Sequence, residues 1–177
     1  LLAFPVRSAK GSFAWITCPL ILQRAVRDGV VSKELLEKLS EPADDTAVFD
    51  SGGTSKLAIN GSLVLEEYTF KANTPGWLGL DKLGTALAAL CPGDPVWSEV
   101  KDRLIILSNG MMSYFVKNAC EIAQHVRIDD ATGTASKGGL FNQENVPSET
   151  LFYAVIHGVP SRIQSAPFKG RSAVEAL

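Results

Sequence analysis

Cysteine and histidine are the side chains of this sequence best suited to nucleophilic or metal chemistry, and their spacing supports neither. Cys18, Cys91 and Cys120 lie far apart and form no CxxC pair, so reduced thiols are favoured over a disulfide framework or a zinc site. His125 and His157 add no zinc-ligand spacing. The sequence also lacks a P-loop and the motifs GxGxxG, HExxH and GxSxG, so nucleotide binding, zinc proteolysis and serine hydrolysis have no signature.

Adjacent carboxylates offer a second kind of chemistry. Asp129-Asp130 could bind a divalent cation through hard oxygen ligands. Consecutive side chains on extended backbone point apart, however, which favours a solvated turn. His125 lies in a β-prone run, where a surface or half-buried histidine is favoured over a ligand-facing one. These residues alone predict a soluble α+β domain without an assigned function.

Positive charge is concentrated in two short stretches. The net charge is −2, so the chain as a whole is not biased toward nucleic acid. Residues 1–27 hold Arg7, Lys10, Arg24 and Arg27 without an acid, and residues 162–171 are also basic and free of acids. These stretches could build a phosphate-binding face, although composition alone favours a plain solvated surface.

Length and composition predict one domain. The chain has 177 residues, of which 46% are apolar and 20% charged, enough for a single core. No apolar run approaches the roughly 20 residues that a membrane span needs. The chain starts at Leu1 without an initiator Met or a basic leader, which argues against a signal peptide and predicts a piece of a longer protein.

Hydrophobic periodicity and capping residues predict alternating strands and helices. Strands are expected at residues 1–6, 13–16, 56–59, 62–70, 104–107, 121–128 and 151–156, and helices at 18–28, 32–39, 80–90, 96–102 and 109–119. Asn60-Gly61 predicts the turn of a hairpin. Residues 41–61 are polar and predict a mobile loop or insertion, and residues 129–150 predict a second long loop.

Three segments, in order along the chain, resemble the backbone subunit of type III-B CRISPR complexes. Residues 4–19 read FPVRSAKGSFAWITCP and are similar to the LPVRS-KG-FAWVT-P segment of that family. Residues 126–129 read VRID, like its RVRID strand. Residues 138–153 read GGLFNQENVPSETLFY, like its KGGLWYEE-LPPETLFY segment. The family is the fourth subunit of the Cmr complex and belongs to the RAMP superfamily.

The resemblance implies an α+β fold with an RRM-like (ferredoxin-like) palm, helical insertions and a protruding β-hairpin thumb. We place the thumb at residues 126–150 of one domain that spans residues 1–177. The implied partners are guide RNA (crRNA), target RNA, other Cmr subunits and copies of the chain in a helical filament, in the cytoplasm and without a membrane. Family members are metal-dependent endoribonucleases, but the catalytic Asp and a Gly-rich loop of the family lie outside the matched segments. We therefore expect Mg²⁺ chemistry only in a full-length protein that has both ends, and assign no catalytic residue or cofactor here.

The RNA-binding residues that we expect suit contacts to the RNA backbone. The Arg7–Gly11 turn offers a guanidinium, a hydroxyl, an ammonium and a flexible amide, and Leu140-Phe141 could act as an apolar wedge that stacks on a base. Simpler roles are a solvated turn, a core position for Phe141 and an Arg127–Asp129 ion pair. The expected RNA-binding set is Arg7, Ser8, Lys10, Gly11, Arg127, Lys137 and Phe141.

Three alternatives stay open at this point. The chain could be a type III-A backbone subunit. It could be an RRM-like structural subunit that makes no RNA contact of its own. It could also cleave RNA itself, with Asp129, Asp130 or Glu144 and a divalent ion.

Overall fold

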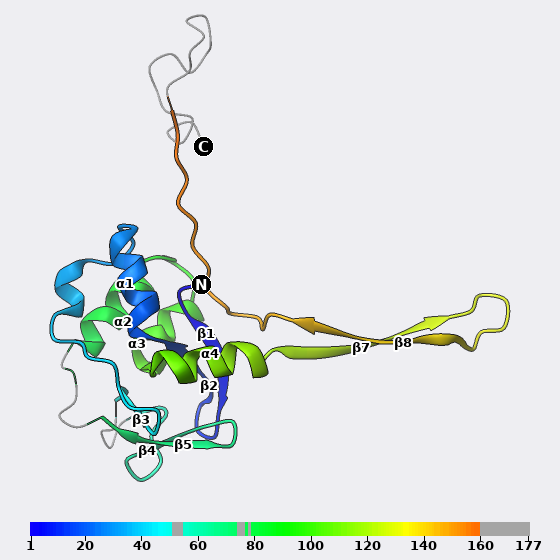
Figure 1. The fold of residues 1–177 in the computed structure, drawn as a ribbon, viewed down its shortest axis with the longest axis horizontal. Coiled ribbons are helices and arrows are strands. Elements are labelled where there is room, and N and C mark those ends of the chain that lie inside the picture. Colours follow the sequence, from blue (N-terminus) through cyan, green and yellow to red (C-terminus); the bar gives the residue numbers. More distant parts are fainter. Residues whose placement is uncertain (51–54, 74–76, 78, 160–177) are drawn as a thin grey trace, which may run out of the picture.

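The computed structural model describes residues 1–50, 55–73, 77 and 79–159. A body made of one sheet and several helices carries a long two-stranded arm that projects from it (Figure 1). No helix in the described ranges is long and apolar enough to span a bilayer. The expected α+β class is confirmed.

A mixed six-stranded sheet forms the centre of the body, in the order β3-β5-β4-β1-β2-β6. Pairs β1–β2, β1–β4 and β4–β5 are antiparallel, whereas β2–β6 and β3–β5 are parallel. The strands are β1 (Phe4–Ser8), β2 (Ser12–Thr17), β3 (Thr46–Ala47), β4 (Ser62–Leu65), β5 (Tyr68–Ala72) and β6 (Leu104–Ile106). The expected strands at 13–16 and 104–107 are confirmed, and the one at 1–6 begins and ends later.

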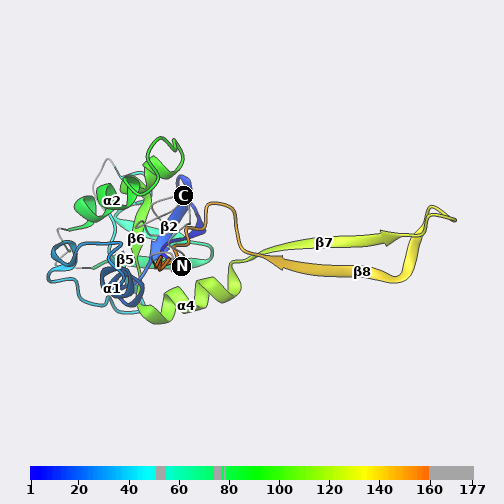
Figure 2. The ribbon, with the colours of Figure 1, turned by 90° about the horizontal axis from the view of Figure 1, so that it is seen from above.

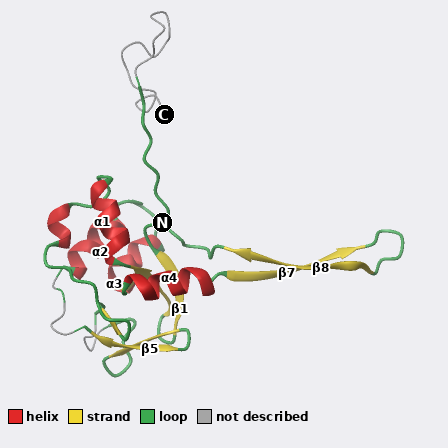
Figure 3. Cartoon of the chain, in the orientation of Figure 1, coloured by secondary structure: helices red, strands yellow, loops and turns green. Residues whose placement is uncertain are grey.

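The expected helices at 18–28, 80–90 and 109–119 are confirmed, the one at 32–39 is reduced to a 3-10 turn, and the one at 96–102 is a 3-10 turn followed by a short helix. Pro19 opens α1 directly after Cys18, because a first-turn position needs no N–H donor. Ser108 Oγ caps α4 by accepting a hydrogen bond from Met111 N. The helices are α1 (Pro19–Arg27), α2 (Leu80–Ala88), α3 (Val100–Arg103), α4 (Asn109–Asn118) and the 3-10 turns η1 (Lys33–Leu36) and η2 (Trp97–Glu99) (Figure 3).

The sheet separates two hydrophobic clusters because alternate residues of a strand face opposite sides. Ile16 of β2 belongs to one cluster, together with Phe115 of α4. Trp15, the neighbour of Ile16, belongs to the other, together with Leu22 of α1 and Leu83 of α2. Helix α4 therefore packs on one side of the sheet, and α1, α2 and α3 pack on the other.

Three expectations between residues 41 and 72 need correction. The expected strand at 62–70 is two strands, β4 and β5, because Glu66 adopts a left-handed φ of 49° and turns the chain. The segment 41–61 was expected to be a loop, but residues 46–47 form β3 and residues 48, 49, 57 and 58 are buried. The strand expected at 56–59 is reduced to the Ile59–Ser62 bridge, which confirms the expected turn at Asn60-Gly61. Residues 51–54 lie outside the described part.

The arm, residues 121–145, consists of β7 (Glu121–Ile128) and β8 (Ala135–Asn145), which pair only with one another. Figure 2 shows the arm standing clear of the body beyond the end of α4. The expected loop at 129–150 is wrong for half of its length, because residues 135–145 continue the ladder.

Residues 147–153 return the chain from the arm to the body. Leu151 exchanges backbone hydrogen bonds with Ala3, and Trp15 Nε1 donates to the Glu149 carbonyl at 2.9 Å. Tyr153 Oη donates to Asp28 at 2.8 Å, and hydrogen bonds from Arg27 and Tyr153 lower the pKa of Asp28. These contacts fix the root of the arm. The expected strand at 151–156 is reduced to a single bridge at Leu151.

Candidate nucleic-acid interface

The turn between β1 and β2 is the first candidate contact with RNA. Gly11 has a φ of +79°, and a Cβ there would lie 2.8 Å from the Lys56 carbonyl oxygen. Only glycine fits this combination of left-handed backbone and close approach. Gly11 therefore shapes the turn by letting it press against residues 55–58.

Lys10, which we expect to contact RNA, is also hydrogen-bonded to the body. Its Nζ donates hydrogen bonds to the carbonyl oxygens of Ser55 at 2.7 Å and Ala58 at 3.0 Å. An ammonium group has three protons, so two of them are already used. Lys10 thus ties the turn to a segment 45 residues away in sequence.

Arg103, which sequence reasoning missed, locks the turn from its other side. Its Nη1 donates to the Gly11 and Phe13 carbonyl oxygens, and its guanidinium lies 5.6 Å from the centre of the Phe13 ring. Its Nε lies 2.6 Å from a Glu99 carboxylate oxygen, and hydrogen bonding from Arg103 lowers the pKa of Glu99. No local motif announces a contact that spans 92 residues.

Arg7 and Ser8 differ in accessibility although they are neighbours on β1. Arg7 is exposed and has no salt-bridge partner among the described residues. Ser8 is buried, and its hydroxyl has no hydrogen-bond partner within the described ranges. Arg7 is therefore a solvent-accessible cation of this turn without an ion-pair partner in the described part of the chain, whereas Lys10, which is also exposed, uses two of its protons on carbonyl oxygens.

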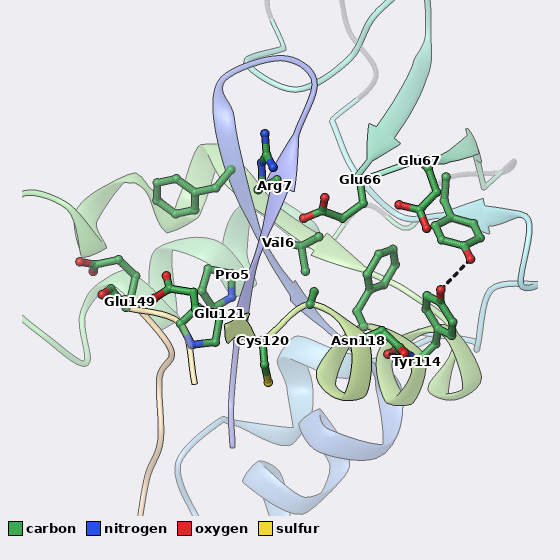
Figure 4. A pocket seen from close by; sticks show the side chains of 16 residues that line it. Pro5, Val6, Arg7, Glu66, Glu67, Tyr114, Asn118, Cys120, Glu121 and Glu149 are labelled. Carbon is green, nitrogen blue, oxygen red and sulfur yellow. Dashed lines mark hydrogen bonds between the residues drawn. The ribbon is translucent and has the colours of Figure 1, made fainter. Parts of the chain in front are cut away.

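A cavity of about 530 Å³ lies beside Arg7, at the root of the arm (Figure 4). Four carboxylates line it, from Glu66 and Glu67 on the β4–β5 turn, Glu121 of β7 and Glu149 of the return segment. The end of α4 also lines it, and a helix C-terminus carries partial negative charge. The cavity is unfavourable for a phosphate except at its Arg7 rim.

Two tyrosines close the far side of this cavity. Tyr68 Oη donates to Tyr114 Oη at 2.8 Å, with the rings edge to face at 5.3 Å. This hydrogen bond, together with burial, raises the pKa of Tyr68 to about 12. Tyr68 is therefore neutral at ordinary pH, and the charge of the cavity comes from its glutamates and Arg7.

Phe141 lies on the arm, where it meets a partner that the sequence did not reveal. It pairs with His125 across the ladder, and the two rings are stacked with centroids 5.2 Å apart and an angle of 20° between their planes. Phe141 is 56% exposed, so the expected simpler role in the core is wrong. Leu140 pairs with Val126 on the opposite face. The two residues therefore cannot form one wedge, and that expectation is wrong.

The other expected arm residues are exposed. Arg127 follows His125 at a register irregularity, and Lys137 lies in the outer half of β8. The structure places no salt bridge between Arg127 and Asp129 among the described residues. The arm thus brings Phe141 and Arg127 into one region, whereas Arg7, Ser8, Lys10 and Gly11 lie on the body.

The acidic residues considered for metal chemistry do not gather. Asp129 Oδ1 accepts hydrogen bonds from the Ala131 and Thr132 backbone and so closes the tip of the arm. Glu144 pairs with Ile122 near the root, about 20 Å away along the ladder. No group of three His, Cys, Asp or Glu side chains in the described ranges could hold a metal ion.

Comparison with known proteins shows which family the chain belongs to. No protein-family model matches the chain. The chain is 31% identical over 162 residues to the CRISPR system Cmr endoribonuclease Cmr4 of Pyrococcus furiosus. The aligned residues make up 90% of this chain and 53% of that protein. The chain is a homologue of Cmr4. This finding confirms the resemblance to the type III-B subunit.

Solved structures agree with this assignment. The crystal structure of Pyrococcus furiosus Cmr4 (Cas7) is 26% identical and covers 67% of this chain and 47% of that chain, with a TM-score of 0.53. Oligomeric Cmr4 from the same organism is 23% identical and covers 84% of this chain and 50% of its own, with a TM-score of 0.59.

A chain of the type III-B Cmr-beta complex bound to cognate target RNA is 16% identical and covers 85% of this chain and 51% of its own, with a TM-score of 0.50. It and oligomeric Cmr4 establish the shared fold alone. The chain spans about half the length of Cmr4.

Proposed function

We propose that this chain is a guide-RNA-binding backbone subunit of a type III-B CRISPR interference complex. Its body would act as the RRM-like palm and its arm as the thumb. Copies would stack into a filament along crRNA in the cytoplasm, together with other Cmr subunits and target RNA. Homology to Cmr4 supports the family role, and the oligomeric state named for one structural relative supports the filament.

The observation that carries the proposal is the exposed arm. Ile122, Val126, Leu140 and Phe141 are each at least half exposed, and neither strand of the arm pairs with the body. A hairpin that buries so little contributes little to the stability of the body. Large exposed apolar side chains mark binding surfaces, so the arm is built to act on a partner.

Contacts to RNA in this proposal are divided between the arm and the turn. Arg127 and Lys137 supply cations on the arm, and Arg7 supplies one at the turn. Such contacts hold the RNA backbone without reading its sequence, which suits a subunit that leaves recognition to base pairing. Lys10 and Arg103 act on the same RNA indirectly, by fixing the turn that presents Arg7.

The name of the relative includes an endoribonuclease activity, and cleavage of target RNA stays a proposal for the whole protein. We assign no residue of this chain to it. Asp129 already caps the tip through its side chain, and Glu144 lies at the other end of the arm. Asp129 and Glu144 therefore lie too far apart to share one metal ion.

The salt dependence of RNA binding separates the two cations of the turn. Arg7→Ala is expected to weaken binding of a labelled single-stranded RNA and to reduce the slope of log K against log salt by about 0.7, the value for one lost phosphate contact. Lys10→Ala is expected to weaken binding with the slope unchanged, because its ammonium contacts protein carbonyls. Fluorescence anisotropy at several salt concentrations measures both quantities.

Lys33→Ala is the matched control, since Lys33 is exposed on η1, away from the turn and the arm. Equal slopes of log K against log salt for wild type and Arg7→Ala would show that Arg7 does not contact an RNA phosphate. Absence of RNA binding by the wild-type chain, combined with self-association, would favour the alternative of a purely structural subunit.

A further inference from the structure

Strand β1 has one edge that is only partly paired. Along this edge Ala3 bridges to Leu151, and the Arg7 carbonyl oxygen accepts a hydrogen bond from Glu66 N at 3.0 Å. Alternate residues of a strand turn their backbone groups to the same edge. Pro5 therefore faces this edge too, and no strand of the described part pairs with it there. The cavity at the root of the arm lies at this opening, with Pro5 and Arg7 in its wall (Figure 4).

The lining of the cavity favours a long basic side chain. Its four glutamates are exposed, and none of them forms a salt bridge with a described residue. They are too dispersed for a metal ion, since the described part of the chain holds no metal-binding group of three such side chains. The rings of Phe13, Tyr68 and Tyr114 also line the wall. Arg and Lys fit this lining, because their carbon stems pack on rings while their charged ends reach carboxylates.

The C-terminal part of the chain carries the matching charge. Residues 162–171, which lie outside the described ranges, contain three cations and no acid. We call them the basic stretch; its cations are Arg162, Lys169 and Arg171.

The described residues that lead to the basic stretch point away from the body. Residues 154–159 belong to no helix or strand, and Figure 1 shows them leaving the body. Their larger apolar side chains, Val155, Ile156 and Val159, are each at least half exposed. Exposed apolar side chains that follow one another mark a contact surface. This direction presents the basic stretch to another molecule rather than to the cavity of its own chain.

We infer that the cavity of one copy receives the basic stretch of a second copy. The inference rests on the proposed function, in which copies stack into a filament, and it names the cavity and the segment that join them. A contact between two different surfaces repeats from copy to copy and builds an open assembly. An extended segment laid along the open edge of β1 adds backbone hydrogen bonds there, while its cations meet the glutamates.

Charge reversal tests this contact on the whole chain. Glu67→Lys with Glu149→Lys reverses charge in the cavity, and Arg162→Glu with Lys169→Glu and Arg171→Glu reverses the basic stretch. Either variant alone is expected to raise the dissociation constant for self-association at least about tenfold, because like charges then meet. Sedimentation velocity measures this constant. An equimolar mixture of the two variants is expected to restore association, since contacts between unlike variants pair opposite charges.

Glu34→Lys with Glu37→Lys is the matched control for the cavity variant. It changes the net charge of the chain by the same amount, at two exposed positions on and beside η1. This control is expected to associate as the wild type does.

Reversal variants that associate as tightly as the wild type would overturn the inference. So would a mixture that fails to associate, because the opposite charges would then meet within one chain. Both results leave the proposed function in place. A wild-type chain that stays monomeric with and without a guide-like RNA would instead remove the filament from the proposed function, and the inference would fail with it.

Discussion

Removal of the arm is expected to abolish most RNA binding while the body stays folded. Glu121 and Asn145 pair directly across the ladder, so their Cα atoms lie about 5 Å apart and a short Gly-Ser linker can replace residues 122–144. The sheet and both hydrophobic clusters include no residue of the arm. We therefore expect a nearly unchanged melting temperature and an RNA affinity reduced at least about tenfold, the loss of one stacked base with its neighbouring cations.

A smaller deletion provides the control for this experiment. Ile128 pairs with Ala135, so residues 129–134 can be replaced by Asn-Gly, which suits a two-residue hairpin turn. This variant keeps His125, Arg127 and Phe141 and is expected to bind RNA as the wild type does. Full affinity of the armless chain would place the RNA on the body. Loss of folding in the armless chain would show that the body needs the arm in order to fold.

Among substitutions that affect the turn between β1 and β2, Arg103→Ala is expected to reduce stability the most, although residue 103 lies far from this turn in sequence. The variant loses the hydrogen bonds to the Gly11 and Phe13 carbonyl oxygens. The Gly11 carbonyl oxygen keeps its hydrogen bond from the Phe13 backbone N–H, but loss of the charged donor to the Phe13 carbonyl oxygen costs about 1–3 kcal/mol in the free energy of unfolding. Urea unfolding measures this difference. RNA affinity should also fall, because the turn that presents Arg7 is no longer held in place.

Two variants of the same helix sharpen this prediction. Arg103→Lys keeps the charge but not the planar fork, and is expected to recover only a small part of the loss. Lys101→Ala removes an exposed cation from α3 and is expected to change little. If Arg103→Ala is as stable as Lys101→Ala, Arg103 does not lock the turn.

The contact between Arg103 and Glu99 also makes the stability of the fold depend on pH. Arg103 lowers the pKa of Glu99 below its ordinary value of 4.5. A group whose pKa is lower in the folded state stabilises the fold above its unfolded pKa and loses that contribution as pH falls through the folded value. Wild type should therefore lose this contribution below about pH 4.5, whereas Arg103→Ala should lose less, because only the weaker attraction of Lys56 then lowers the pKa of Glu99.

Local signals predicted most of the helices and the first strand of the arm, β7, but not the second, β8. Pro19 and Ser108 mark helix starts because their effect depends on the nearest few residues alone. Asn60-Gly61 marks a turn for the same reason. The resemblance segments predicted a β-hairpin at residues 126–150, and the structure has one at residues 121–145.

Contacts between distant segments could not be predicted in this way. Lys10 meets carbonyls 45 or more residues away, and Arg103 meets one 92 residues away. Their side chains look like ordinary surface cations in sequence. The stack of His125 on Phe141 depends on register, and register follows from where the hairpin turns. A shift of one residue would have joined His125 to Leu140 or Asn142 instead.

Photo-crosslinking tests the central claim most directly, because it asks which residues RNA contacts. A guide-like RNA containing 4-thiouridine would be bound to the whole chain, irradiated, and the adducts mapped by mass spectrometry. We expect adducts on residues 121–145, foremost at His125 and Phe141, and further adducts near Arg7. Adducts confined to the body away from β1 and the arm, or none at all with the RNA bound, would contradict this account.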